Sequence, residues 1–114
     1  MAAPTGRFSP TKISMRFQEI EDLTKCNLKI EFYPPVNIWE FIEMEDAKNV
    51  FKKQGFKNVD ISSSGSKTER GIFTVLSLSS DIPVSLAKYD SIISRLLSAV
   101  KSLFKKLPLK VKKQ

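Results

Sequence analysis

The C-terminal part of the chain holds the residues whose charge and spacing point most directly to chemistry. Between Ser91 and Gln114 there are seven Lys or Arg and no Asp or Glu. Six of these cations are the lysines Lys101, Lys105, Lys106, Lys110, Lys112 and Lys113. Lysines this close together can neutralise the phosphates of a nucleic-acid backbone, and each neutralised phosphate steepens the salt dependence of binding. The alternative is a solvated helix face followed by a solubilising tail.

A second group of residues suits the same ligand. Arg70, Lys67 and Lys29 could form another basic patch, and Tyr33 or Phe73 could add a stacking platform for bases. Strand alternation favours a core position for Phe73, in which case the loop charges are merely hydrated. Whether Phe73 faces the solvent or the core therefore decides between base stacking and binding by charge alone.

Other kinds of site find little support. The chain has no His, and Cys26 is its single cysteine, so zinc sites built from Cys and His and triads with an imidazole base are excluded. The acidic cluster fits the capping of a helix start better than acid–base or cation chemistry. The glycines form no phosphate-cradling pattern, and the serines at 62–66 have no base partner. We expect a protein without catalysis, metal or cofactor. The acidic cluster is Glu40, Glu43, Glu45 and Asp46.

The length of the chain and the distribution of its charge limit how its domains can be organised. With 114 residues the chain fits one domain with a modest core. The net charge is +7, but residues 1–50 hold six basic and eight acidic residues, and residues 51–114 hold thirteen and four. This asymmetry predicts one basic face. We expect a flexible arm over residues 1–11, a single domain over 12–107, and a basic tail or short edge strand over 108–114.

Hydrophobic periodicity places the strands. Alternation predicts strands over residues 27–33, 57–63 and 72–78, and the first of these must stop at Pro34. Residues 12–19 fit a strand, although a helix fits almost as well. The polar run at 62–71 indicates a hairpin loop. Residues 109–112 could form a short edge strand.

Helix signals place the other elements. A helix over 46–54 should end at Gly55 in a Schellman motif, with Phe56 reaching back to Phe51. Asp81 followed by Pro83 indicates the start of the last helix, whose apolar stripe runs over 86–107. Residues 36–44 fit either a strand or a helix capped at Asn37. Trp39 could be a core residue or an anchor for a partner.

The expected order of elements defines the fold class. From residue 27 the order is strand, helix, strand, strand, helix and short strand, which is the split β-α-β arrangement of an α+β, ferredoxin-like sandwich. Right-handed crossovers place both helices on one face of an antiparallel sheet and leave the other face open. Residues 12–19 would add an extra N-terminal strand.

Four segments together resemble an RNA-recognition-motif domain over residues 27–112. These are LKIEFYPP, AKNVFKKQGFKNVDIS, KTERGIFTV and LPLKVKK. In that family, aromatic residues on the first and third strands stack on bases. On this sequence those positions fall on Lys29, Ile72 and Thr74, none of which is aromatic, whereas a slip of one residue would turn Phe73 and Val75 to the open face. The resemblance thus implies the topology more strongly than the binding chemistry.

These observations lead to two expected functions. The first is a small nucleic-acid-binding module, with RNA favoured over DNA, that grips the backbone through the basic C-terminal helix and tail. The alternative is a protein-interaction or assembly subunit, homodimeric or heteromeric, that uses the last amphipathic helix or the open sheet face. Membrane-surface association through residues 96–107 is weaker, because the same stripe must close the core.

The N-terminus and the apolar runs suggest a location. The start of the chain lacks a secretory apolar core, and no apolar run approaches the length of a membrane span. We expect an intracellular protein of the cytoplasm or nucleus. An organelle is the alternative, because Arg7, Lys12 and Arg16 precede the first acidic residue, Glu19.

Overall fold

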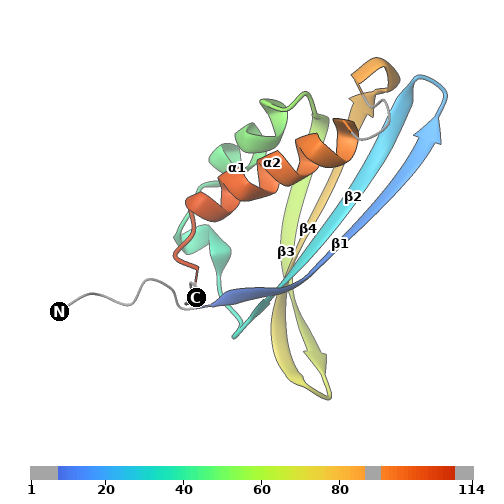
Figure 1. Cartoon of the computed structure of the whole chain (residues 1–114). Helices are drawn as coiled ribbons and strands as arrows, with labels where there is room; N and C mark the ends of the chain where they lie inside the picture. Colours follow the sequence, from blue (N-terminus) through green and yellow to red (C-terminus); the bar gives the residue numbers. More distant parts are fainter. Residues whose placement is uncertain (1–7, 87–90, 110–114) are drawn as a thin grey trace.

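The computed structural model describes residues 8–86 and 91–109, and Figure 1 shows how their elements are arranged. Four long strands supply most of the structure, two α-helices follow the second and fourth strands, and two 3₁₀ turns complete it. In chain order the elements are β1 (Ser9–Ile20), β2 (Leu23–Tyr33), the 3₁₀ turn η1 (Ile38–Glu40), α1 (Met44–Lys52), β3 (Lys57–Thr68), β4 (Gly71–Pro83), the 3₁₀ turn η2 (Val84–Leu86) and α2 (Ser91–Lys105).

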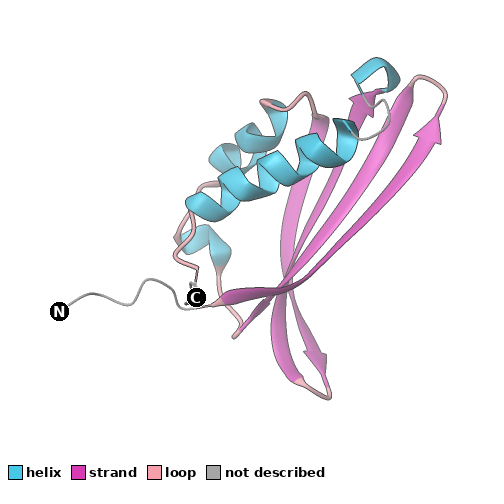
Figure 2. Cartoon of the chain, in the orientation of Figure 1, coloured by secondary structure: helices cyan, strands magenta, loops and turns pink. Residues whose placement is uncertain are grey.

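The four strands form one antiparallel sheet in the order β1-β2-β4-β3. Both α-helices lie on the same side of this sheet (Figure 2). The expected α+β, ferredoxin-like sandwich is therefore confirmed. The edge beside β2 is taken by β1, so the N-terminal segment at 12–19 is a strand. Of the short strand expected after Pro108, only Leu109 is described, in an isolated parallel bridge to Phe8; residues 110–112 lie outside the described residues.

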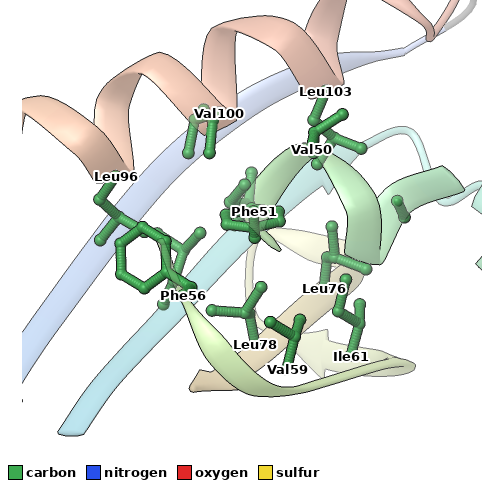
Figure 3. Close-up of a cluster of buried hydrophobic side chains, with 14 of the residues drawn as sticks. Val50, Phe51, Phe56, Val59, Ile61, Leu76, Leu78, Leu96, Val100 and Leu103 are labelled. Atoms are coloured by element: carbon green, nitrogen blue, oxygen red, sulfur yellow. The ribbon is translucent and has the colours of Figure 1, made fainter. Parts of the chain in front are cut away.

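The core lies between the sheet and the helices. Even-numbered side chains of β2 and β4, such as Ile30 and Leu78, point toward the helices and are buried. The opposite alternation leaves the odd-numbered side chains on the sheet face away from the helices, which we call the open face. Figure 3 shows side chains from α1, the turn after it, β3, β4 and α2 meeting in this core: Val50, Phe51, Phe56, Val59, Ile61, Leu76, Leu78, Leu96, Val100 and Leu103.

The end of α1 follows the predicted Schellman motif. Gly55 has φ of +99°, and its N–H donates to the carbonyl of Lys52 at 3.0 Å, while the N–H of Phe56 donates to the carbonyl of Phe51 at 3.3 Å. The rings of Phe51 and Phe56 are 6.3 Å apart. These bonds satisfy the last carbonyls of the helix and direct the chain into β3.

Residues 36–44 form neither a strand nor a long helix. Asn37 caps the 3₁₀ turn η1, and its side chain accepts a hydrogen bond from the Trp39 N–H at 3.3 Å. Trp39 is partly buried and packs against the core. The structure thus supports the core interpretation of the tryptophan.

Three expected boundaries are wrong. The predicted loop at 62–71 is mostly strand, because the serines at 62, 64 and 66 pair with β4 and alternate onto the open face; only Glu69 and Arg70 form the turn. Asp81 does not start a helix, since β4 continues to Pro83 and buries Ile82. Residues 8–11 are not part of an arm, because Phe8 is buried and β1 begins at Ser9.

One side chain fastens the loop after β2 to the sheet. The Thr74 hydroxyl accepts a hydrogen bond from the Val36 N–H at 2.7 Å and donates to the Val36 carbonyl at 2.9 Å. Thr74 is also buried, with 5% of its surface exposed. The segment Pro34–Pro35, which follows Tyr33 through a cis peptide bond, is thereby held against β4.

We therefore expect Thr74→Val to lower the free energy of unfolding by about 1–3 kcal/mol, because two partly buried backbone groups of Val36 lose their partner. Chemical denaturation measures this change. Thr11→Val is the matched control: it removes an exposed hydroxyl that donates to the Glu31 carbonyl at 3.4 Å and should cost less than about 0.5 kcal/mol. Equal losses in the two variants would contradict the role given to Thr74.

Candidate nucleic-acid interface

The open face is polar and basic along β1 and β2. The strand register places Lys29 opposite Ser14, and Arg16 opposite Asn27, with all four side chains on the open side. Around them is a depression of about 680 Å³. It is lined by Ser14, Arg16, Phe17, Gln18, Asn27 and Lys29. Two cations flanked by amide and hydroxyl groups can bind a phosphate by charge-assisted hydrogen bonds.

An aromatic and basic cluster lies on the same face, near the end of β2. The rings of Tyr33 and Phe73 are 5.2 Å apart and tilted by 48°. The guanidinium carbon of Arg70 lies 5.7 Å from the centre of the Phe73 ring, a cation–π distance. Tyr33 is 46% exposed and Phe73 only 7%. The tyrosine ring is therefore the accessible stacking surface, and Phe73 supports it from the side.

Backbone geometry brings Tyr33 close to the β3–β4 turn. Gly71 has φ of +128°, and a Cβ there would lie 3.4 Å from Cε1 of Tyr33. The Thr68 hydroxyl accepts a hydrogen bond from the Arg70 N–H at 3.1 Å and donates to the Gly71 carbonyl at 3.3 Å. A residue without a side chain thus lets the turn adopt its conformation beside the ring.

The third-strand positions that the resemblance to RNA-recognition motifs places on the open face, Ile72 and Thr74, face the helices instead. Thr74 pairs with Phe32 and faces the helices, and Ile72, two residues earlier on β4, has the same orientation. Phe73 and Val75 lie on the open side. The prediction that Phe73 points into the core is wrong, because its ring lies on the open side of the sheet and outside the core cluster. The ring is nevertheless buried, because Tyr33 and Arg70 cover it.

One carboxylate neutralises part of the basic face. Asp81 accepts a hydrogen bond from Nδ2 of Asn58 at 3.0 Å and forms an ion pair with Nζ of Lys25 at 3.3 Å. The hydrogen bond from Asn58, helped by Lys25 and opposed by burial, lowers the pKa of Asp81 below its usual 3.8. Asn58 has φ of +53° within a bulge of β3, a conformation that Asn tolerates well. Lys25 is thus less free for a ligand than Arg16 or Lys29.

The lowered pKa of Asp81 predicts an acid-sensitive contribution to stability. A carboxylate with a lower pKa in the folded state stabilises the fold above its unfolded pKa, and this stabilisation is lost as the pH falls through the folded pKa. We expect the wild type to lose more of its unfolding free energy than Asp81→Asn between about pH 5 and pH 2. Denaturation at several pH values measures this, with Asp60→Asn on the same face as the control. Parallel pH profiles for the wild type and Asp81→Asn would contradict the assignment.

Among the described residues, those that the sequence predicts to bind nucleic acid lie on two different sides of the sheet. Arg70 and Phe73 lie in contact on the open face, and Lys29 is on the same face, four residues along β2 from Tyr33. Lys101, Lys105 and Lys106 belong to α2 and the turn after it, on the helical side of the sheet. Lys67 pairs with Ile72 and has the parity of the helical side. The remaining nominated lysines, Lys110, Lys112 and Lys113, lie outside the described residues.

The lysines on the helical side have different neighbours. Lys106 lines a depression of about 630 Å³ together with Glu40, Glu43 and Asp46, so its charge is opposed by carboxylates. With Lys105 and Lys53 it also borders a second depression of about 430 Å³. No aromatic side chain lines that second depression. Trp39 and Phe41 line the first depression, but they are only partly exposed and lie beside the three carboxylates. This side thus combines cations and partly exposed rings with acids that repel a phosphate.

Sequence reasoning missed Arg16 and the polar residues around it. The alternation of residues 12–19 could have indicated them, because Ser14, Arg16 and Gln18 are the polar residues on one face of that strand. The missing information was the pairing of β1 with β2, which joins residues more than ten positions apart. This pairing sets Arg16 diagonally across from Lys29.

Several alternative sites find no support in the described residues. Cys26 is fully buried, and burial, with a smaller effect of Asp81, raises the pKa of its thiol to about 11, so the thiol is protonated and inaccessible. Within residues 8–86 and 91–109, no cluster of three or more Cys, Asp or Glu side chains is arranged to hold a metal ion. None of the helices in these ranges has the length and apolar character needed to cross a membrane.

Comparison with protein-family models, with curated proteins and with solved structures found no match to this chain.

Proposed function

We propose that this protein binds single-stranded nucleic acid on the open face of its sheet, without catalysis. The observation on which this rests is the half-exposed Tyr33 ring, supported by Phe73 and Arg70, on the same face as Arg16 and Lys29. Aromatic rings stack on unpaired bases of any identity, and nearby cations bind the phosphates that connect them. The resemblance to RNA-recognition motifs agrees with this choice of face.

The spacing of the two groups suits a short segment of a single strand. Lys29 and Tyr33 are four residues apart on β2, which corresponds to roughly 13 Å along the strand. Glu31 lies between them and is directly opposite Lys12, whose charge offsets it. A base on Tyr33 and phosphates over Lys29 and Arg16 would therefore follow the direction of β2. RNA is our preferred ligand, and an intracellular location fits the unpaired cysteine.

The proposal is tested by titrating fluorescently labelled oligonucleotides with the full chain at low salt and following anisotropy. We expect single-stranded RNA and DNA to bind, with affinity that falls as salt rises, and a duplex of the same length to bind more weakly because its bases are not available for stacking. Undetectable binding of single strands at low salt would overturn the proposal. Tighter binding of the duplex would contradict the role of stacking.

Replacing the tyrosine ring tests the stacking surface itself. We expect Tyr33→Leu to weaken binding of a single strand by about tenfold, because stacking on an aromatic side chain contributes about 1–3 kcal/mol per base. Tyr33→Phe keeps the ring and is the matched control, which should bind like the wild type. If both variants bound as the wild type does, the ring would have no role in recognition.

A second candidate function is supported by a separate observation. Several large apolar side chains of β1 and α2 are exposed, among them Ile13, Phe17, Ile93 and Leu97. Exposed apolar side chains of this size favour a protein partner. This surface lies on the helical side of the sheet and does not compete with the open face.

A further inference from the structure

The outer edge of β1 is a long strand edge without a partner in the described part of the chain. β1 spans twelve residues, pairs with β2 on one side, and is the outermost strand of the sheet (Figure 1). Its only proline, Pro10, lies near the start. Proteins usually protect such edges, because unpaired N–H and C=O groups readily pair with another strand.

The side chains beside this edge are apolar and exposed. Ile13, Met15 and Phe17 pair with Ile30, Leu28 and Cys26, so they have the parity of the helical side. Met15 packs against the core, but Ile13 and Phe17 are 40% and 38% exposed. The helices therefore leave the β1 edge of the core uncovered.

One flank of α2 extends this apolar surface. Arg95 donates to the Gln54 carbonyl at 2.8 Å, which fixes the flank of α2 that faces the end of α1. At 100° per residue, Ile93 and Leu97 lie on the opposite flank, and they are 44% and 41% exposed. Because α1 packs over β3 at the far edge of the sheet, this flank faces the β1 edge. We call Ile13, Phe17, Ile93 and Leu97 the edge apolar surface.

We propose that a second copy of this chain pairs with β1 through its own β1, antiparallel, about a twofold axis at Met15. This pairing sets Ile13 of one copy opposite Phe17 of the other, and Met15 opposite itself. Both edges then gain a hydrogen-bonded partner, and each copy covers the edge apolar surface of the other. The register pairs β1 without interruption from Lys12 to Gln18, up to the bulge between Pro10 and Lys12.

The charges on β1 favour this register over a shift of the axis by one residue. With the axis at Met15, Arg16 lies opposite Ser14 and Lys12 opposite Gln18, so no like charges meet directly. Shifting the axis by one residue in either direction would set Arg16 opposite itself or Lys12 opposite Arg16, and like charges directly opposite are destabilising. Residues directly opposite each other must lie on the same face of the sheet. The axis can therefore shift only by whole residues if the apolar row is to stay on the helical side.

The dimer would join the two open faces into one surface. The depressions that contain Arg16 and Lys29 border β1, so they would lie side by side across the axis. Two sites on one continuous sheet could bind one strand at two places and raise its apparent affinity. The pairing itself does not depend on nucleic acid and is tested in its absence.

Light scattering coupled to size exclusion tests the pairing over a range of concentrations. We expect the wild type to approach twice the 12.9 kDa of one chain and Ile13→Glu to remain monomeric, because a carboxylate would face Phe17 of the other copy. Ile72→Glu is the matched control at the far end of the β3–β4 hairpin, and it should still dimerise. A wild type that is monomeric at every concentration, or an Ile13→Glu variant that dimerises normally, would overturn the proposal.

A cysteine at the axis tests the register. Met15→Cys places two thiols opposite each other, so a short bismaleimide should link the copies almost completely. The wild type controls for Cys26, which is buried, and Ile72→Cys controls for random collision. Cross-linking of Ile72→Cys to the same extent, or no cross-linking of Met15→Cys in a sample that is dimeric, would overturn the Met15-centred pairing.

Discussion

Phe32→Ala should lower the free energy of unfolding by about 3–5 kcal/mol, a large part of the total stability of a domain of this size. Phe32 is fully buried on β2, with its ring 5.4 Å from Phe8 in an edge-to-face arrangement and 6.2 Å from Phe104 of α2. Phe8 in turn lies 5.9 Å from Phe41. One ring thus connects the segment before β1, the sheet and the last helix, and its loss leaves a cavity that none of the three can fill.

Chemical denaturation of the full chain measures this effect, and two variants control for it. Phe32→Leu keeps most of the volume and should recover most of the lost stability. Ile72→Ala removes a side chain that is 51% exposed and should change stability by less than about 0.5 kcal/mol. A Phe32→Ala variant as stable as Ile72→Ala would mean that the aromatic cluster does not hold these elements together.

The double charge reversal Arg16→Glu with Lys29→Glu should weaken single-strand binding by about 100-fold. Each cation is expected to make one charge-assisted hydrogen bond to a phosphate, and two such bonds of about 1.5 kcal/mol each correspond to this factor. The slope of log affinity against log salt should also fall by about 1.4, since each phosphate contact contributes about 0.7 for a single strand.

Lys101→Glu with Lys105→Glu is the matched control, because it changes the net charge by the same amount, from +7 to +3. These two lysines lie on α2, on the other side of the sheet. We expect this pair to weaken binding only through the long-range field of the protein. Anisotropy titrations of both double variants at several salt concentrations make the comparison. A larger loss in the α2 pair would place binding on the helical side, contrary to our proposal.

Local patterns predicted the elements that local interactions determine. The alternation of residues 27–33 identified β2, and Gly55 identified the end of α1, because a left-handed residue and a returning Phe56 are visible within six positions of sequence. The two α-helices and their common side followed from the order of elements. These features depend on neighbours in the chain, which is why the sequence alone was sufficient.

Features that depend on distant pairing could not be predicted in this way. Residues 72–76 are apolar at most positions of both parities, so alternation could not decide whether Phe73 or Thr74 faces the helices. The pairing of Thr74 with Phe32 on β2 decides it. In the same way, Asp81 followed by Pro83 fits a helix start, whereas its pairing with Lys25 on β2 and Lys57 on β3 makes it part of a strand.

The candidate site shows the same division. Lys101 and Lys105 are one helical turn apart in α2, and the structure places them on the side of the sheet away from Lys29, Arg70 and Phe73. Arg16 joins the site only because β1 pairs with β2. Net charge indicated an acidic ligand, whereas the arrangement of the strands indicates which of the cations share a surface with an exposed ring.

The most direct test of the open-face proposal is to follow the backbone amide signals of the isotopically labelled protein by NMR while adding a short single-stranded RNA. We predict that the largest shifts fall on β1, β2 and the start of β4, around Arg16, Lys29, Tyr33 and Phe73. The amides of α2 should change little. Shifts confined to α2 near Lys101 and Lys105, with the strands unaffected, would contradict the proposal.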